Sequence, residues 1–291
     1  MAFGGNCEGV SAGRLGQGGC LVMAMRWRVA QCHDDGMGNV YNDERLASVY
    51  HPGNQMPQRS LRAWTDLIGS FGARPGSVVL DMGAGTGMFS AAMARWLPVR
   101  AVIGIDPSVP MLTQARLAAV PPGVHYAAGA AEAIPARHHV FDLALLSRVI
   151  HHLPDRRACA RELARVLRRG GTVVIRTTFR DNLDAPVYRY WPALLEIDRD
   201  RFPGKDEVIA SFTASGFAVT QLMSFAQPVT SSLHEYHARL ATRPGSKFTY
   251  LTDAVFREGL HRLEHDALAE PPSSPAPVSE RYDVLVLTAA T

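Results

Sequence analysis

The sequence predicts a doubly wound α/β fold in which a mostly parallel, seven-stranded sheet carries helices on both faces. Three observations lead to this prediction. Short apolar segments alternate with amphipathic segments from residue 78 onward, and turns rich in Gly and Pro separate them. A glycine-rich loop at 83–87 follows the first apolar segment. This alternation is typical of successive βα units and therefore of a Rossmann-like sheet.

Three regions are predicted along the chain. Residues 1–36 are rich in Gly, lack a sustained hydrophobic period and are expected to form a disordered extension. Residues 37–76 are expected to form a helical N-terminal cap, with helices over 43–50 and 58–71. Residues 77–291 form the predicted α/β domain, with a helical insertion at about 228–280 before the last strand.

The elements of the α/β domain follow from local periodicity and from turn residues. Strands are predicted at 78–81, 100–105, 125–128, 141–146, 172–177, 217–222 and 283–287. Helices are predicted at 89–96, 110–118, 156–168, 205–215, 230–241 and 251–269. Each crossover between parallel strands is expected to be right-handed.

The composition limits the classes of partner. With 47% hydrophobic and 20% charged residues, the chain resembles an ordinary globular protein. A net charge of +3 is too small to indicate a nucleic-acid partner. The four cysteines form no CxxC pair, so we expect no metal site and a reduced, cytoplasmic setting. The apolar stretch 21–25 is too short to span a membrane, and no membrane partner is expected.

The glycine loop has the pattern Gly83-x-Gly85-x-Gly87. Met88 stands where a dinucleotide fingerprint has Gly or Ala, and no lysine is near, as a phosphate-binding P-loop would require. Asp81 precedes the loop and would repel phosphate. The loop therefore favours a ligand without phosphate that approaches the backbone closely, and S-adenosylmethionine fits this description. Asp81 is expected to accept a hydrogen bond from its amino group.

Asp106 ends the next predicted strand. A carboxylate at this place can accept hydrogen bonds from both hydroxyls of a ribose. The carboxyl ends of parallel strands meet at one edge of the sheet, where ligands bind in this architecture. Asp106 and the glycine loop are therefore expected to share one site.

Five segments in order resemble successive motifs of class I S-adenosylmethionine-dependent methyltransferases. They are LDMGAGTG, IGIDPS-x-x-ML, GAAEAIP, FDLALLSRVIHHLPD and ARVLRRGGTVVIRT. The nearest branch is the small-molecule type that includes the quinone-biosynthesis (type 11) methyltransferases. The resemblance covers about residues 41–225 and implies a methyltransferase that uses S-adenosyl-L-methionine.

The resemblance also implies roles for individual residues. The methionine end of the cofactor is assigned to Asp81, Gly83, Gly85 and Gly87, and the ribose to Asp106. Met111 is expected near the adenine, and Ala130 and Ala131 at its edge. The family often has Asp at the place of Ala130, so one side-chain contact to the adenine is missing here. Ser147 and Arg148 are expected to line the side of the cofactor that carries its sulfonium group.

His151 is the candidate general base. Plant-type O-methyltransferases carry their catalytic histidine in a similar segment, and His152 occupies the next position. A base is needed only if the acceptor must lose a proton. The alternative stays open, because paired histidines are common in the wider family without a catalytic role.

Aromatic and His side chains from three segments are expected to line the acceptor pocket. They are Tyr41, Tyr50 and Trp64 in the cap; Tyr188, Tyr190, Trp191 and Phe202 after the fifth strand; and His234, Tyr236 and His237 in the insertion. Such a lining suits a planar or hydrophobic small molecule. The alternative is that these aromatic side chains are ordinary core residues.

Nucleic-acid methyltransferases are disfavoured by the residues themselves. Enzymes that methylate base amines have Asn/Asp/Ser-Pro-Pro-aromatic after the fourth strand, whereas this chain has Ser-Arg-Val-Ile at 147–150. Methyl transfer to a small organic acceptor is the favoured function, with secondary metabolism as the expected setting. The alternative is a non-methylating enzyme such as a cyclase, or a non-catalytic binding protein of the same fold. The acceptor atom and the oligomeric state stay open.

Overall fold

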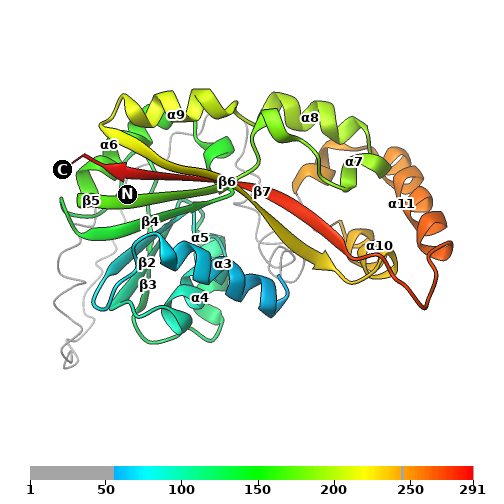
Figure 1. The fold of residues 1–291 in the computed structure, drawn as a ribbon, viewed down its shortest axis with the longest axis horizontal. Coiled ribbons are helices and arrows are strands. Elements are labelled where there is room, and N and C mark those ends of the chain that lie inside the picture. Colours follow the sequence, from blue (N-terminus) through cyan, green and yellow to red (C-terminus); the bar gives the residue numbers. More distant parts are fainter. Residues whose placement is uncertain (1–55, 244–245, 291) are drawn as a thin grey trace, which may run out of the picture.

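The structure is a computed structural model and describes residues 56–243 and 246–290. It contains a seven-stranded sheet with the order β3-β2-β1-β4-β5-β7-β6 (Figure 1). The strands are β1 (Val78–Met82), β2 (Ala101–Asp106), β3 (Val124–Ala128), β4 (Phe141–Ser147), β5 (Leu167–Thr177), β6 (Phe217–Thr230) and β7 (Val278–Ala289). Strands β1 to β5 pair in parallel, whereas β7 runs antiparallel to β5 and β6. The predicted fold class is confirmed.

Helices cover both faces of the sheet. They are α3 (Gln58–Ser70), α4 (Met88–Trp96), α5 (Val109–Leu117), α6 (Arg156–Val166) and α9 (Lys205–Thr213). On one face, Trp64 of α3 and Phe89 of α4 pack against Val79 and Val174. On the other face, side chains of α6 and α9 pack against the alternate strand residues. Because both faces are covered, β1 and β2 are buried along their whole length, as their apolar sequences predict.

The strand order reverses between β1 and β4. Strand β1 is followed by β2 on one side, and β4 lies on its other side. In open α/β sheets, ligands bind outside the carboxyl ends of the strands at this switch point. The predicted site residues at the ends of β1, β2 and β4 therefore gather at one edge.

Strands β6 and β7 are longer than the predicted segments 217–222 and 283–287. Thr177, the last residue of β5, pairs with Asp283, so residues 278–282 run beyond the carboxyl end of β5. There they pair with residues 225–230 of β6. We call residues 224–230 and 278–283 the ribbon. Pro228 lies within β6, which is an edge strand, where Pro is tolerated.

The ribbon carries the helical insertion, residues 231–277, which contains α10 (Leu233–Ala241), η4 (Ser246–Tyr250) and α11 (Asp253–Leu268). The helices predicted at 230–241 and 251–269 are thus confirmed. Helices α7 (Val187–Tyr190) and α8 (Ala193–Arg201) pack with the insertion around a separate apolar core. Figure 1 shows this helical group at the end of the ribbon, beyond the sheet.

Several predictions fall outside the described residues: the extension over 1–36, the helix at 43–50, Tyr41 and Tyr50. Within residues 56–243 and 246–290, no helix is long and apolar enough to cross a membrane. The same residues contain no group of three or more His, Cys, Asp or Glu side chains arranged to hold a metal ion.

Candidate functional site

The glycine loop connects β1 to α4 and lies beside the carboxyl end of β2. The Gly83 and Ala84 amides donate to the Ile105 carbonyl at 2.7 and 3.1 Å. Gly83 and Gly85 have φ values of +73° and +54°, which favour glycine. A Cβ at Gly83 would collide with Val149, whereas a Cβ at Gly85 would meet no atom of the described residues within 4 Å. The backbone at Gly85 therefore faces open space that a ligand can enter.

Asp106 connects this loop to the start of α5. Its Oδ2 accepts a 2.8 Å hydrogen bond from the Gly85 amide, and its Oδ1 accepts a 2.8 Å bond from the Ser108 amide. Burial raises the pKa of the Asp106 carboxyl, and the two amides counteract this effect. Each carboxylate oxygen has a second lone pair, so the fixed side chain retains acceptors for a ribose.

Asp81 lies beneath the loop and is 2% exposed. Its Oδ2 accepts a 2.6 Å hydrogen bond from the Ser90 hydroxyl. Burial raises the pKa of Asp81 to about 6, although the Ser90 hydrogen bond lowers it. Sequence reasoning missed Ser90, which lies on α4 one turn after the loop. A cationic amino group near Asp81 would favour its ionised form.

The residues assigned to the adenine lie at the ends of β2 and β3. Met111, on the first turn of α5, is buried, and its amide donates to the Ser108 side chain at 3.3 Å. Ala130 and Ala131 follow β3, and Ala131 is buried. The structure thus places these three residues at the same edge as Asp106.

Ser147 ends β4, and Arg148 follows it with a φ of +60°. This backbone conformation is costly for a residue other than glycine. The Arg148 amide donates to the Arg176 carbonyl at 2.8 Å, which holds the turn against β5. Arg176 also donates from its guanidinium to the Ser147 hydroxyl at 3.3 Å. Sequence reasoning missed Arg176, although a charged residue in the apolar segment 173–177 is a signal.

His151 lies on the short helix η2 (Ile150–His152), directly after the Arg148 turn. Its ring packs between His152, with centroids 4.0 Å apart, and Phe202, at 4.5 Å. Burial is the largest cause that lowers the pKa of His151 well below its ordinary value, and nearby cations such as Arg148 add to it. The buried Nδ1 has no hydrogen-bond partner among the residues that the structure describes. A neutral imidazole with a vacant nitrogen is the form that can accept a proton.

Trp191 does not line an open pocket, which corrects our expectation. It is 1% exposed, and its Nε1 donates to the Phe256 carbonyl at 3.0 Å. The indole stacks on Phe256 and lies against Gly259, where a Cβ would collide with it. The alternative stated for the aromatic residues, a core position, therefore holds for Trp191.

The other residues predicted to line the acceptor pocket occupy varied positions. Tyr188 is half-buried and donates to Asp198 at 2.8 Å. Tyr236 is 1% exposed, and its hydroxyl has no hydrogen-bond partner within the described part of the chain. His234 is exposed on the first turn of α10. Phe202 contacts His151, so it is the member of this set that the structure brings to the predicted base.

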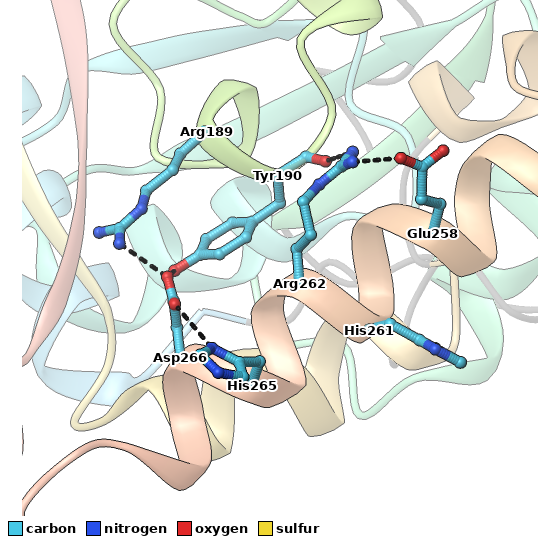
Figure 2. Close-up of a pocket in the computed structure, with 7 residues that line it drawn as sticks. All are labelled: Arg189, Tyr190, Glu258, His261, Arg262, His265 and Asp266. Carbon is cyan, nitrogen blue, oxygen red and sulfur yellow. Dashed lines mark hydrogen bonds and ion pairs between the residues drawn. The ribbon is translucent and has the colours of Figure 1, made fainter.

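A cavity of about 530 Å³ opens between α7 and α11 (Figure 2). It is lined by Arg189, Tyr190, Glu258, His261, Arg262, His265 and Asp266. Asp266 pairs with Arg189 at 2.7 Å and accepts from the Tyr190 hydroxyl at 3.2 Å, while Arg262 donates to the Tyr190 carbonyl at 2.7 Å. These contacts join α7 to α11, and apart from Tyr190 none of the lining residues belongs to the predicted site.

Comparisons with known proteins match the part of the chain that contains the glycine loop and Asp106. The family model described as "Methyltransferase domain" matches residues 80–175. A demethylmenaquinone methyltransferase of Roseiflexus castenholzii is 30% identical over 149 residues, which are 50% of this chain and 63% of that protein. An uncharacterized 37.1 kDa protein in transposon TN4556 of Streptomyces fradiae is 35% identical over 111 residues, which are 38% of this chain and 32% of that protein. The chain thus spans less than two thirds of either relative.

Solved structures show the same fold. A putative methyltransferase from an antibiotic biosynthesis pathway of Anabaena variabilis is 25% identical, with a TM-score of 0.60 over 77% of this chain and 96% of that chain. The [4+2]-cyclase SpnF is 20% identical, with a TM-score of 0.56 over 82% of this chain and 85% of that chain. The matched motifs and the fold make S-adenosylmethionine the cofactor of this domain, and the open face of Gly85 beside Asp106 fits it.

Proposed function

We propose that the chain, which carries a class I S-adenosylmethionine-dependent methyltransferase domain resembling type 11, moves a methyl group to a small organic acceptor. One observation carries the proposal. The Gly85 amide is fixed on Asp106 at 2.8 Å, and the space before Gly85 is open. Such a loop accepts a nucleoside with an amino acid tail and has no lysine for phosphate.

Positioning is the main contribution of the chain to the reaction. S-adenosylmethionine, when bound, supplies a methyl group on a positively charged sulfur. The rest of the molecule is a good leaving group, because it departs as a neutral thioether. Orientation of two reactants can contribute roughly 7–11 kcal/mol to catalysis. The Gly83–Gly87 loop and Asp106 would hold the donor, and the turn at Ser147 and Arg148 would border the acceptor.

We assign His151 the role of general base for an acceptor that must lose a proton. Its neutral ring, vacant Nδ1 and position after β4 support this role. The low pKa makes the imidazole a weak base, so it suits an acidic hydroxyl better than an amine or an aliphatic alcohol.

The position of the helical insertion is a further argument for a small acceptor. It is attached to the ribbon, which begins where the carboxyl ends of the parallel strands lie, and Phe202 brings an aromatic ring to His151. A role in secondary metabolism is consistent with the name of the Anabaena variabilis neighbour, which places that protein in an antibiotic pathway.

A non-methylating reaction, such as cyclisation, or non-catalytic binding is the second candidate, because a [4+2]-cyclase has the same fold. Incubation with isotope-labelled S-adenosylmethionine and candidate acceptors separates the two. Methyl transfer gives labelled product and one equivalent of S-adenosylhomocysteine. Product without S-adenosylhomocysteine would replace the proposal by the cyclase alternative.

A further inference from the structure

Arg176 is a buried cation whose described partners are uncharged. It is 2% exposed at the carboxyl end of β5. Its guanidinium donates to Gln227 Oε1 at 2.7 Å and to Ser147 Oγ at 3.3 Å. The rings of Tyr282 and Trp64 lie 3.7 and 4.6 Å from its central carbon. Among residues 56–243 and 246–290, its Nε–H finds no hydrogen-bond partner.

The charge of the Glu280 carboxylate raises the pKa of Arg176, but the two side chains do not form a salt bridge. Glu280 Oε2 accepts a 2.6 Å hydrogen bond from the Tyr282 hydroxyl. Within the part of the chain that the structure describes, Arg176 forms no salt bridge. Burial lowers the pKa of Arg176, and the cation of Arg148 lowers it further, while the charge of Glu280 raises it.

An unpaired guanidinium is expensive to bury. It keeps its charge under ordinary conditions, and its desolvation is only partly offset by amide oxygens and aromatic faces. An apolar side chain would fill a purely structural position at lower cost. The vacant Nε–H forms one edge of the planar donor fork that matches a carboxylate in two-point hydrogen bonding. An anionic ligand would therefore complete this arrangement.

The position of Arg176 points to the acceptor and not to the methyl donor. The sheet order places β4 between β1, which leads into the glycine loop, and β5, which carries Arg176. Strands β1 and β5 are therefore two strand spacings apart, which is roughly 10 Å. Arg176 also contacts Gln227 and Tyr282 of the ribbon, which supports the helical insertion.

We propose that Arg176 binds a carboxylate of the acceptor, so that the substrate class is a small organic acid. The identification of this anion as the acceptor rests on the proposed methyl transfer. The rings of Trp64 and Tyr282 and the amide of Gln227 position the guanidinium, which leaves its buried Nε–H as the donor for that carboxylate.

A binding experiment tests this inference without turnover. The full chain, labelled with ¹⁵N in its arginines and saturated with S-adenosylhomocysteine, is titrated with acetate and benzoate, and with acetamide and benzamide. The Arg176 Nε–Hε signal is assigned by its loss in Arg176→Lys. We expect both acids to shift this signal in a saturable manner and to bind about tenfold or more tightly than the amides, since a charged hydrogen bond is lost in each amide.

Gln227→Glu is the matched variant, because it places a carboxylate within hydrogen-bond distance of Arg176. It should abolish acid binding while melting temperature and S-adenosylhomocysteine affinity hold. Arg168→Gln, at an exposed arginine paired with Asp142, should leave acid binding unchanged. Absence of any acid-dependent shift in the wild-type chain overturns the inference. So does acid binding that persists in Gln227→Glu, or loss of S-adenosylhomocysteine binding in Arg176→Lys, which would assign Arg176 to the donor. A chain that binds benzoate but transfers no methyl group would refute the proposed function and leave the anion site intact.

Discussion

The amide of Gly85 donates a 2.8 Å hydrogen bond to the carboxylate of Asp106, twenty-one residues further along the chain. This bond joins the loop after β1 to the end of β2. It fixes the backbone beside the one loop glycine, Gly85, that faces open space. The donor site therefore depends on a single carboxylate both for its shape and for its expected contact with a ribose.

Asp106→Asn should weaken S-adenosylhomocysteine binding by about 10- to 100-fold, because a charged acceptor and one backbone contact are lost. Asp142→Asn is the control. Asp142 also accepts a 2.8 Å bond from a backbone amide, that of Val78, but at the amino end of β1. Titration calorimetry should give wild-type affinity for Asp142→Asn, and equal losses in the two variants would contradict the assignment.

Gly85→Ala should fold but bind the cofactor about tenfold or more weakly, which corresponds to ~1.4 kcal/mol. The added methyl group enters the space before the loop, and the left-handed backbone adds roughly 1–2 kcal/mol of strain. Gly76→Ala imposes similar strain, at a φ of +86° and with no atom nearby, in the turn before β1. Thermal unfolding and calorimetry on both variants separate strain from ligand contact. Unchanged affinity in Gly85→Ala would place the ligand elsewhere.

Cofactor affinity should depend on pH through Asp81. Burial raises the pKa of Asp81 to about 6 in the free protein, and the ionised carboxylate is the form that attracts an amino cation. Affinity should therefore be constant well above pH 6 and decrease as the pH falls through this value. Asp81→Asn should bind more weakly at neutral pH and lose this dependence. A wild-type affinity that is constant from pH 7 to pH 5 would argue against a contact between Asp81 and the amino group.

His151→Ala should lower turnover about 100-fold or more, within the range for general bases, while cofactor affinity holds. Because the pKa of His151 is lowered well below 6.5, its base form is complete at neutral pH. At saturating cofactor, the wild-type rate should therefore not decrease until the pH is well below 6.5. An unchanged rate in His151→Ala, once an acceptor is known, removes His151 from the mechanism. His152→Ala, at the exposed neighbouring position, is the matched control variant.

The sequence predicted the sheet and the donor edge because both depend on local patterns. Apolar runs such as 78–82 identify buried strands, and the spacing of Gly83, Gly85 and Gly87 identifies the loop. The acceptor side depends on contacts between distant segments. Gln227 reaches Arg176 from a strand 51 residues further along, and no periodicity signals such a pair. Trp191 shows the same limit, since aromatic residues in a core and in a pocket look alike in sequence.

The structure of a complex with S-adenosylhomocysteine tests the central claim most directly. The account predicts the homocysteine part along 83–87, the ribose hydroxyls within hydrogen-bond distance of Asp106, and the sulfur facing the turn at Ser147 and Arg148. A ligand bound away from the carboxyl ends of β1 and β2, or one whose ribose does not contact Asp106, would contradict it.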